Sequence, residues 1–157
     1  MKFVFTLLLI SFSTIAFSQM TFKELVKIYK MDMAQFEEYA LSRGYEFHDF
    51  RRDEDLNGVR YSKGEGKETK YLTLYDNFYG NGNTVEFQTC VSSELLKIKT
   101  EIKKFGYTLY ESNFMENKIK YDDYKRGVLK LSIYTKPPND ENNYVIYEIS
   151  FGKYYKN

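Results

Sequence analysis

The most suggestive chemical pattern in the sequence is the run DEDLNG at residues 53–58. Oxygen-bearing side chains alternate there and a glycine follows, which is the spacing of the first half of a calcium-binding loop. We take Asp53, Asp55 and Asn57 as candidate metal ligands. The twelfth position of such a loop carries a glutamate that binds through both oxygens, but here it is Gly64. The pattern therefore favours an acidic hairpin turn, with calcium binding as the alternative.

A second cluster could exchange protons. His48 is followed by Asp49, and a histidine beside a carboxylate can serve as a general acid or base. The chain has one histidine and one cysteine, Cys90, and no serine or cysteine stands in a recognisable nucleophile motif. These counts also exclude a disulfide framework and a Cys/His zinc site. We expect a protein without catalytic activity, with a hydrolase that uses His48 and nearby carboxylates as the alternative class.

The third feature is the abundance of tyrosine, with 16 copies in 157 residues. Tyrosine offers a large rigid ring with a polar tip, which protein interfaces and sugar-binding sites favour. The same rings can also stabilise a sheet by packing across strands, without any partner. The candidates on one face of the predicted sheet and in the hairpin at residues 76–83 are Tyr71, Tyr75, Phe78, Tyr79, Tyr134 and Tyr144.

Helices and strands must position these residues. Capping boxes begin at Thr21 and Asp32, and Gly44 and Gly106 are typical helix stops. We expect one helix over residues 22–30, one from Asp32 to Gly44, and one capped by Ser92 or Ser93 that ends before Gly106.

After each of these two glycines the apolar period changes from helical to alternating, which predicts four strands. Residues 72–75 align with residues 131–134, and residues 83–85 align with residues 143–145. The sequence therefore predicts an α+β fold of two tandem units, each a helix followed by a four-stranded antiparallel meander. The units span about residues 21–90 and 91–157 of one domain over residues 19–157. Strands are expected at residues 45–50, 58–62, 69–76, 84–90, 107–111, 117–122, 128–135 and 144–151, with hairpin turns at Asn57-Gly58 and Asn81-Gly82.

This plan resembles the secreted beta-lactamase inhibitor proteins, which are built from two tandem helix-plus-four-strand units forming one concave sheet. The resemblance rests on Gly44-Tyr45, on Gly106-Tyr107 and on the aligned strands, and it covers residues 19–157 at the level of architecture. Those inhibitors carry a disulfide in each unit, whereas this chain has only Cys90. The resemblance implies an inhibitor or immunity-like role and identifies no target.

Residues 1–18 have the pattern of a secretory signal peptide. Lys2 precedes an apolar stretch, and Ala16 and Ser18 are small residues at the recognition positions of a cleavage site. Gln19 follows in place of the cysteine that a lipid anchor needs, and no second apolar run predicts membrane insertion after cleavage. The ending is similar to signal peptides of some Gram-negative bacteria. We therefore expect a periplasmic or extracellular protein.

The charges of the chain nearly balance, with 23 basic and 22 acidic side chains and a formal net charge of +1. This balance lacks the positive excess typical of nucleic-acid binding. We therefore expect a protein that binds a protein partner through the tyrosine-bearing face and needs no cofactor. The alternative is a small-ligand or glycan binder, assisted by calcium at Asp53, Asp55 and Asn57.

Overall fold

The computed structural model describes residues 19–53, 56–77 and 82–153. These form an α+β fold, which confirms the predicted class. Within them no helix is both long and apolar enough to cross a membrane. The helices are α1 (Phe22–Ile28), α2 (Met33–Ser42), α3 (Ser92–Lys104) and the short 3-10 helix η1 (Gly66–Glu68). The strands are β1 (Glu46–Asp53), β2 (Leu56–Lys63), β3 (Lys70–Asn77), β4 (Thr84–Thr89), β5 (Thr108–Phe114), β6 (Lys120–Arg126), β7 (Leu129–Lys136) and β8 (Ile146–Lys153).

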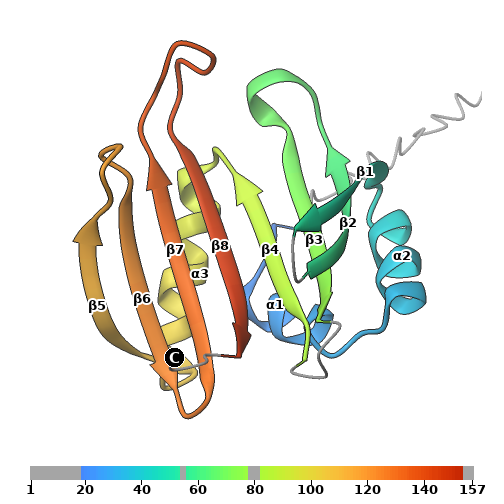
Figure 1. Cartoon of the computed structure of the whole chain (residues 1–157), viewed down its shortest axis with the longest axis horizontal. Helices are drawn as coiled ribbons and strands as arrows, with labels where there is room; N and C mark the ends of the chain where they lie inside the picture. Colours follow the sequence, from blue (N-terminus) through green and yellow to red (C-terminus); the bar gives the residue numbers. More distant parts are fainter. Residues whose placement is uncertain (1–18, 54–55, 78–81, 154–157) are drawn as a thin grey trace, which may run out of the picture.

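All eight strands belong to one antiparallel sheet with the order β1-β2-β3-β4-β8-β7-β6-β5 (Figure 1). The strands β1 to β4 are successive neighbours, as are β5 to β8, and the pair β4–β8 joins the two sets at the centre. The outermost strands β1 and β5 each contain an irregularity in register, between Phe47 and Asp49 and between Leu109 and Glu111. Each of these is a β-bulge, which bends an edge strand.

The first two helices begin as predicted. The Thr21 hydroxyl accepts from the Glu24 backbone N–H at 3.1 Å, and the Asp32 carboxylate accepts from the Gln35 N–H at 2.8 Å. In each case the side chain of the third helical residue accepts a hydrogen bond from the backbone N–H of the cap residue, so both capping boxes are complete.

The start of α3 corrects one prediction. Its cap is Val91, which supplies no side-chain hydrogen bond, and Ser92 and Ser93 are already helical. The Thr89 hydroxyl accepts from the Val91 N–H at 3.1 Å, which turns the chain into the helix before either serine. At the other end, Gly106 has a φ of +77°, a left-handed conformation suited to glycine, so the predicted stop is confirmed.

All three helices pack on one face of the sheet, and α1 and α3 lie behind the sheet in Figure 1. Phe22 of α1 meets the rings of Phe105, Tyr107 and Phe151 edge-on, with centroids 5.3, 5.1 and 5.5 Å away. Because Phe151 belongs to β8, the first helix packs against the second set of strands. The buried apolar sheet residues on the helix side are Tyr61, Leu72, Leu74, Val85, Phe87, Tyr124, Leu131, Ile133, Ile149 and Phe151.

The last strand begins later than predicted. It starts at Ile146, so Tyr144 lies in the loop that joins β7 to β8. Pro137 and Pro138 follow β7 directly, and because proline has no N–H to donate, strand pairing stops there. The alignment of residues 83–85 with 143–145 is therefore wrong in register. Val85 pairs with Leu74 in the way that Ile149 pairs with Ile133.

The turn predicted at Asn57-Gly58 is also wrong. Both residues lie within β2, opposite Arg52 and Arg51, and β1 joins β2 through residues 54–55, outside the described residues. A Cβ atom on Gly58 would lie 2.5 Å from Cδ1 of Tyr75 on the neighbouring strand. The glycine is therefore required by the close approach of an aromatic ring and not by a turn.

Candidate functional site

The side of the sheet opposite the helices carries the predicted tyrosines. Tyr71 and Tyr75 on β3 and Tyr134 on β7 alternate with buried core residues, so they point away from the helices, and all three are partly exposed. We call this side of the eight strands the open face. Tyr144 is also partly exposed, in the loop after β7, whereas Phe78 and Tyr79 lie outside the described residues.

Tyr75 is fixed by its neighbours. Its ring lies against Gly58, and its hydroxyl donates to Glu86 Oε2 at 3.1 Å. Burial, together with the negative charge of Glu86, raises the pKa of Tyr75 above its usual value. Burial, together with the charge of Glu148, also raises the pKa of Glu86. The Tyr75 ring and the Glu86 carboxyl group therefore pack together and cover this part of the open face.

Tyr71 lies between two cationic or ionisable groups. The Arg60 guanidinium is 5.4 Å from the centre of its ring, and the His48 ring meets it at 5.1 Å. The Arg60 Nε also donates to the Thr73 hydroxyl at 3.2 Å. The imidazole that the sequence offered for acid–base chemistry thus packs on an aromatic ring, and the neighbouring Asp49 pairs with Arg51 at 3.4 Å.

Tyr134 lies in a different setting. Across β6 and β7 it is opposite Tyr121, whose hydroxyl donates to Glu111 on β5. A groove of about 690 Å³ extends over these three strands and under the hairpin that joins β5 to β6. Asp123 lines this groove and pairs with Lys130 at 2.8 Å.

Sequence reasoning missed Tyr121, Asp123 and Glu111 as site residues. Its strand over residues 117–122 ended too early, whereas β6 spans Lys120–Arg126. The segment KYDDYKR at residues 120–126 alternates around the core residue Tyr124, and that signal could have placed Tyr121 and Asp123 on the open face.

The candidate calcium ligands are only partly placed. Asp55 and the side chain of Asp53 are outside the described residues, and Asn57 is exposed on β2. Over the described part of the chain, no group of three or more His, Cys, Asp or Glu side chains is positioned to hold a metal ion. Calcium binding therefore stays a prediction. The thiol of Cys90 is half-buried just after β4 and points to the Lys67 carbonyl.

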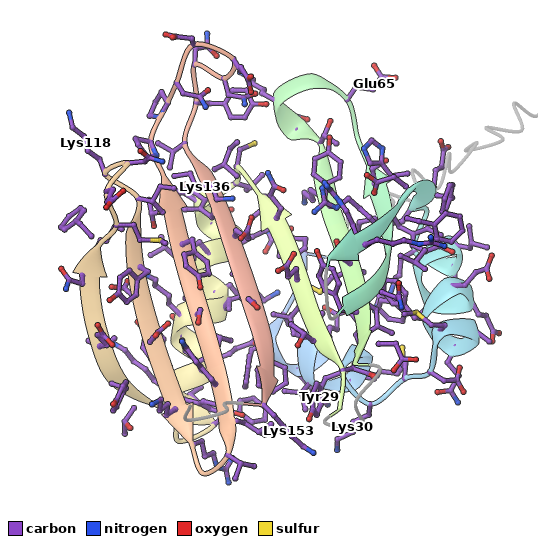
Figure 2. The ribbon with its side chains drawn as sticks, viewed as in Figure 1. Tyr29, Lys30, Glu65, Lys118, Lys136 and Lys153 are labelled. Carbon is purple, nitrogen blue, oxygen red and sulfur yellow. The ribbon has the colours of Figure 1, made fainter. Side chains whose placement is uncertain are left out.

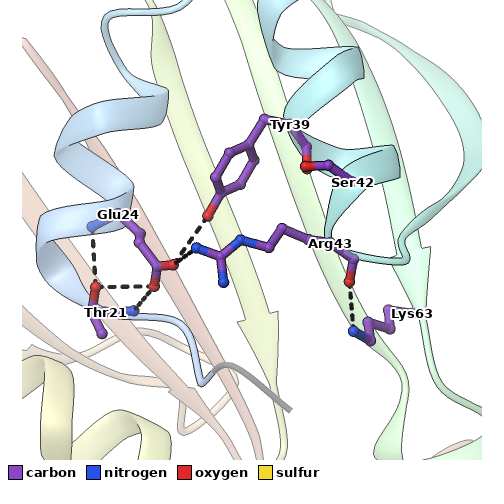
Figure 3. A network of polar contacts seen from close by, with 6 residues as sticks. All are labelled: Thr21, Glu24, Tyr39, Ser42, Arg43 and Lys63. Atoms are coloured by element: carbon purple, nitrogen blue, oxygen red, sulfur yellow. Dashed lines mark hydrogen bonds and ion pairs between the residues drawn. The ribbon is translucent and has the colours of Figure 1, made fainter. Parts of the chain in front are cut away.

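A polar network on the helix side was also missed, because the sequence indicated Glu24 only as a capping residue. Its carboxylate also accepts from the Tyr39 hydroxyl at 3.4 Å and pairs with the Arg43 guanidinium (Figure 3). The backbone carbonyl of Arg43 in turn accepts from Lys63 Nζ at 2.6 Å. Burial, reinforced by Glu24, raises the pKa of Tyr39 to about 12. The network fastens α1 to α2 and to β2.

The open face thus combines fixed tyrosines over β2 to β4 with a groove over β5 to β7. No protein-family model, no curated protein and no solved structure matches the chain.

Proposed function

We propose that this chain is a non-catalytic binding protein that contacts a protein partner through its open face. The observation that carries the proposal is the one-sided packing of the sheet: the helices cover one face, while the other presents partly exposed tyrosines among charged side chains. A broad aromatic and ionic surface suits a protein partner better than a small molecule, which needs deep enclosure.

The proposed contact residues are Tyr71, Tyr75, Tyr134 and Tyr144, extended by Phe78 and Tyr79. The position of Tyr75 is fixed, because its ring lies against Gly58 and its hydroxyl donates to Glu86. Tyr71 and Tyr134 are partly exposed on the same face. An inhibitor or immunity-like role is compatible with such a surface.

We further propose that the chain consists of two tandem units, residues 21–90 and 91–157. Two observations support this. Tyr45 and Tyr107 each follow a glycine in the left-handed conformation. Their N–H groups donate to carbonyls of the preceding helix, Ala40 at 3.0 Å and Ile102 at 3.1 Å. The bulges in β1 and β5 also follow these tyrosines at the same distance along the chain.

The proposed site of action is the periplasm or the space outside the cell, after removal of residues 1–18. Expression of the full chain in a Gram-negative host, followed by mass spectrometry of the purified protein, tests this. We expect a mature chain that begins at Gln19. Recovery of a chain that still begins at Met1 would contradict the proposal.

Site-specific photo-crosslinking tests the partner-binding role. A benzoylphenylalanine placed at Tyr134 should attach the chain to one protein of the cell envelope or medium. The matched control carries the same side chain at Leu96, which is 64% exposed on α3, on the helix side. Attachment from position 134 alone supports the proposal, whereas equal attachment from both positions, or none, contradicts it.

A further inference from the structure

The groove over β5, β6 and β7 differs from the rest of the open face in its charge. Among the described residues that line it are three carboxylates, those of Glu111, Glu116 and Asp123, and one cation, Lys130. Glu111 accepts from the Tyr121 hydroxyl, and Lys130 is paired with Asp123. The lining therefore offers more hydrogen-bond acceptors than donors.

Asp123 adds a second, independent observation. The residue is only 5% exposed although it lies on the open face. One oxygen, Oδ2, is 2.8 Å from Lys130 Nζ, but the other, Oδ1, is buried and has no hydrogen-bond partner among the described residues, as is also true of Asp49 Oδ1 on β1. A buried carboxylate oxygen left without a donor is unfavourable. A ligand in the groove would relieve this cost only by displacing the side chains that cover Oδ1.

The aromatic residues limit the chemistry of that ligand. Tyr121 and Tyr134 lie opposite each other on adjacent strands, and both line the groove. Tyrosine rings attract cations over their faces, and arginine does this in addition to donating several hydrogen bonds. The apolar Phe114 and Met115 at the rim, 66% and 50% exposed, can cover the methylene groups of a long side chain.

We propose that this groove receives an arginine or lysine side chain of the protein partner, with Glu111, Glu116 and Asp123 as its hydrogen-bond acceptors. The inference rests on the proposed function and specifies the chemistry of the partner at one place on the open face. A neutral sugar suits the groove less well, because a sugar brings as many acceptors as donors.

An NMR titration of the purified protein, labelled with nitrogen-15, tests the groove without the partner. The probe is N-acetyl-arginine methylamide, and we expect binding with a Kd of about 1 mM that shifts the amide signals of Tyr121, Asp123 and Tyr134. The matched probe is the citrulline derivative, which has the same shape but no charge, and it should cause no saturable shift. Equal binding of the two probes, or tighter binding of maltotriose at these residues, would overturn the inference.

Variants assign the binding to the carboxylates. Glu111→Gln and Glu116→Gln are exposed substitutions that preserve size, and together they should weaken arginine binding about tenfold. The control is Glu65→Gln. Glu65 lies in the connection between β2 and β3, away from the β5–β6 hairpin beside the groove, which carries Lys118 (Figure 2). Unchanged affinity in the double variant, or an equal loss in the control, would show non-specific attraction and overturn the inference.

The two proposals fail in different ways. If crosslinking at Tyr134 captures a partner equally in the wild type and in the Glu111→Gln, Glu116→Gln variant, the binding function stands and the groove inference is wrong. If no partner is captured, the proposed function is wrong, and the arginine titration still decides whether the groove binds a cationic side chain.

Discussion

The strand pairs β2–β3 and β6–β7 correspond in register, because Tyr61 pairs with Leu72 as Tyr124 pairs with Leu131. On the open face, however, they differ in the residue that lies opposite a tyrosine. Gly58 is opposite Tyr75, whereas Tyr121 is opposite Tyr134. The glycine leaves room for the Tyr75 ring to lie across the strand, while a second ring beside Tyr134 occupies that space.

The two strand pairs also differ in charge at one corresponding position. Arg60 lies opposite Thr73 in the first pair, and Asp123 occupies the corresponding position opposite Ser132 in the second. Arg60 satisfies its neighbours, since it contacts Tyr71 and Thr73. In the described part of the chain, Asp123 Oδ1 has no hydrogen-bond partner, and on β1 the same holds for Asp49 Oδ1 and Arg51 Nε. The same backbone arrangement therefore carries a tyrosine packed over a glycine in one pair and a groove in the other, depending on a few side chains.

The largest expected effect tests whether the two halves fold together. Phe22 of α1 packs against Tyr107 and Phe151, which belong to the second half. We expect Phe22→Ala to lower the free energy of unfolding by about 3–5 kcal/mol in one urea transition. Leu41→Ala, at a 53% exposed position on α2, is the control and should cost less than about 1 kcal/mol. Two separate transitions would show that the halves are independent, and the comparison would then concern two domains.

The next effect concerns acid. Burial alone would raise the pKa of Asp122, but hydrogen bonds from Ser112, Lys120 and Lys99 outweigh it and lower that pKa from 3.8 to about 2. Because this pKa is lower in the folded than in the unfolded chain, the stabilisation is present above about pH 4 and is lost as the pH falls toward 2. We expect a loss of about 2 kcal/mol in urea unfolding between these pH values.

Asp122→Asn should flatten this pH dependence. The raised pKa of Glu86 acts in the opposite sense, because its protonation favours the folded chain. An equally steep loss of stability in Asp122→Asn would mean that other carboxyl groups cause it.

A smaller effect distinguishes the surface around Tyr75 from the groove over β5, β6 and β7. Tyr75→Phe removes the donor to a carboxyl group whose pKa is raised by burial, so we expect a loss of about 1 kcal/mol in urea unfolding. Tyr121→Phe removes the donor to Glu111, which is exposed to water, and should cost less than about 0.5 kcal/mol. Equal losses would remove the distinction between the two halves.

The smallest effect concerns the helices that support each half. The helices α1 and α2 begin with complete capping boxes, while the cap residue of α3, Val91, provides no side-chain hydrogen bond. Val91→Asp should therefore raise the free energy of unfolding by about 0.5–1 kcal/mol. Ser93→Ala, a change inside the first turn, is the control and should leave stability nearly unchanged. A destabilised Val91→Asp protein would show that the valine side chain matters more than the missing cap.

Much of the fold could be predicted because its signals are local. Thr21 and Asp32 begin helices through contacts three residues away, and strict alternation around Leu72 and Leu131 identifies the buried face. The groove could not be predicted, because it depends on which residues face one another across strands. Gly58 illustrates the limit: its neighbour Asn57 indicates a turn, but the ring that requires the glycine is 17 positions further along the chain.

The bulges in β1 and β5 bear on how copies of this chain meet. An open sheet has unpaired N–H and C=O groups along both outer strands, and a straight outer strand invites a further strand from another molecule. Here both borders are bent by an extra residue, so continuous strand addition is opposed at either end. The two bent outer strands therefore disfavour growth of the sheet into a fibre. Contact between copies of the chain through the broad open face is less hindered than contact through the outer strands.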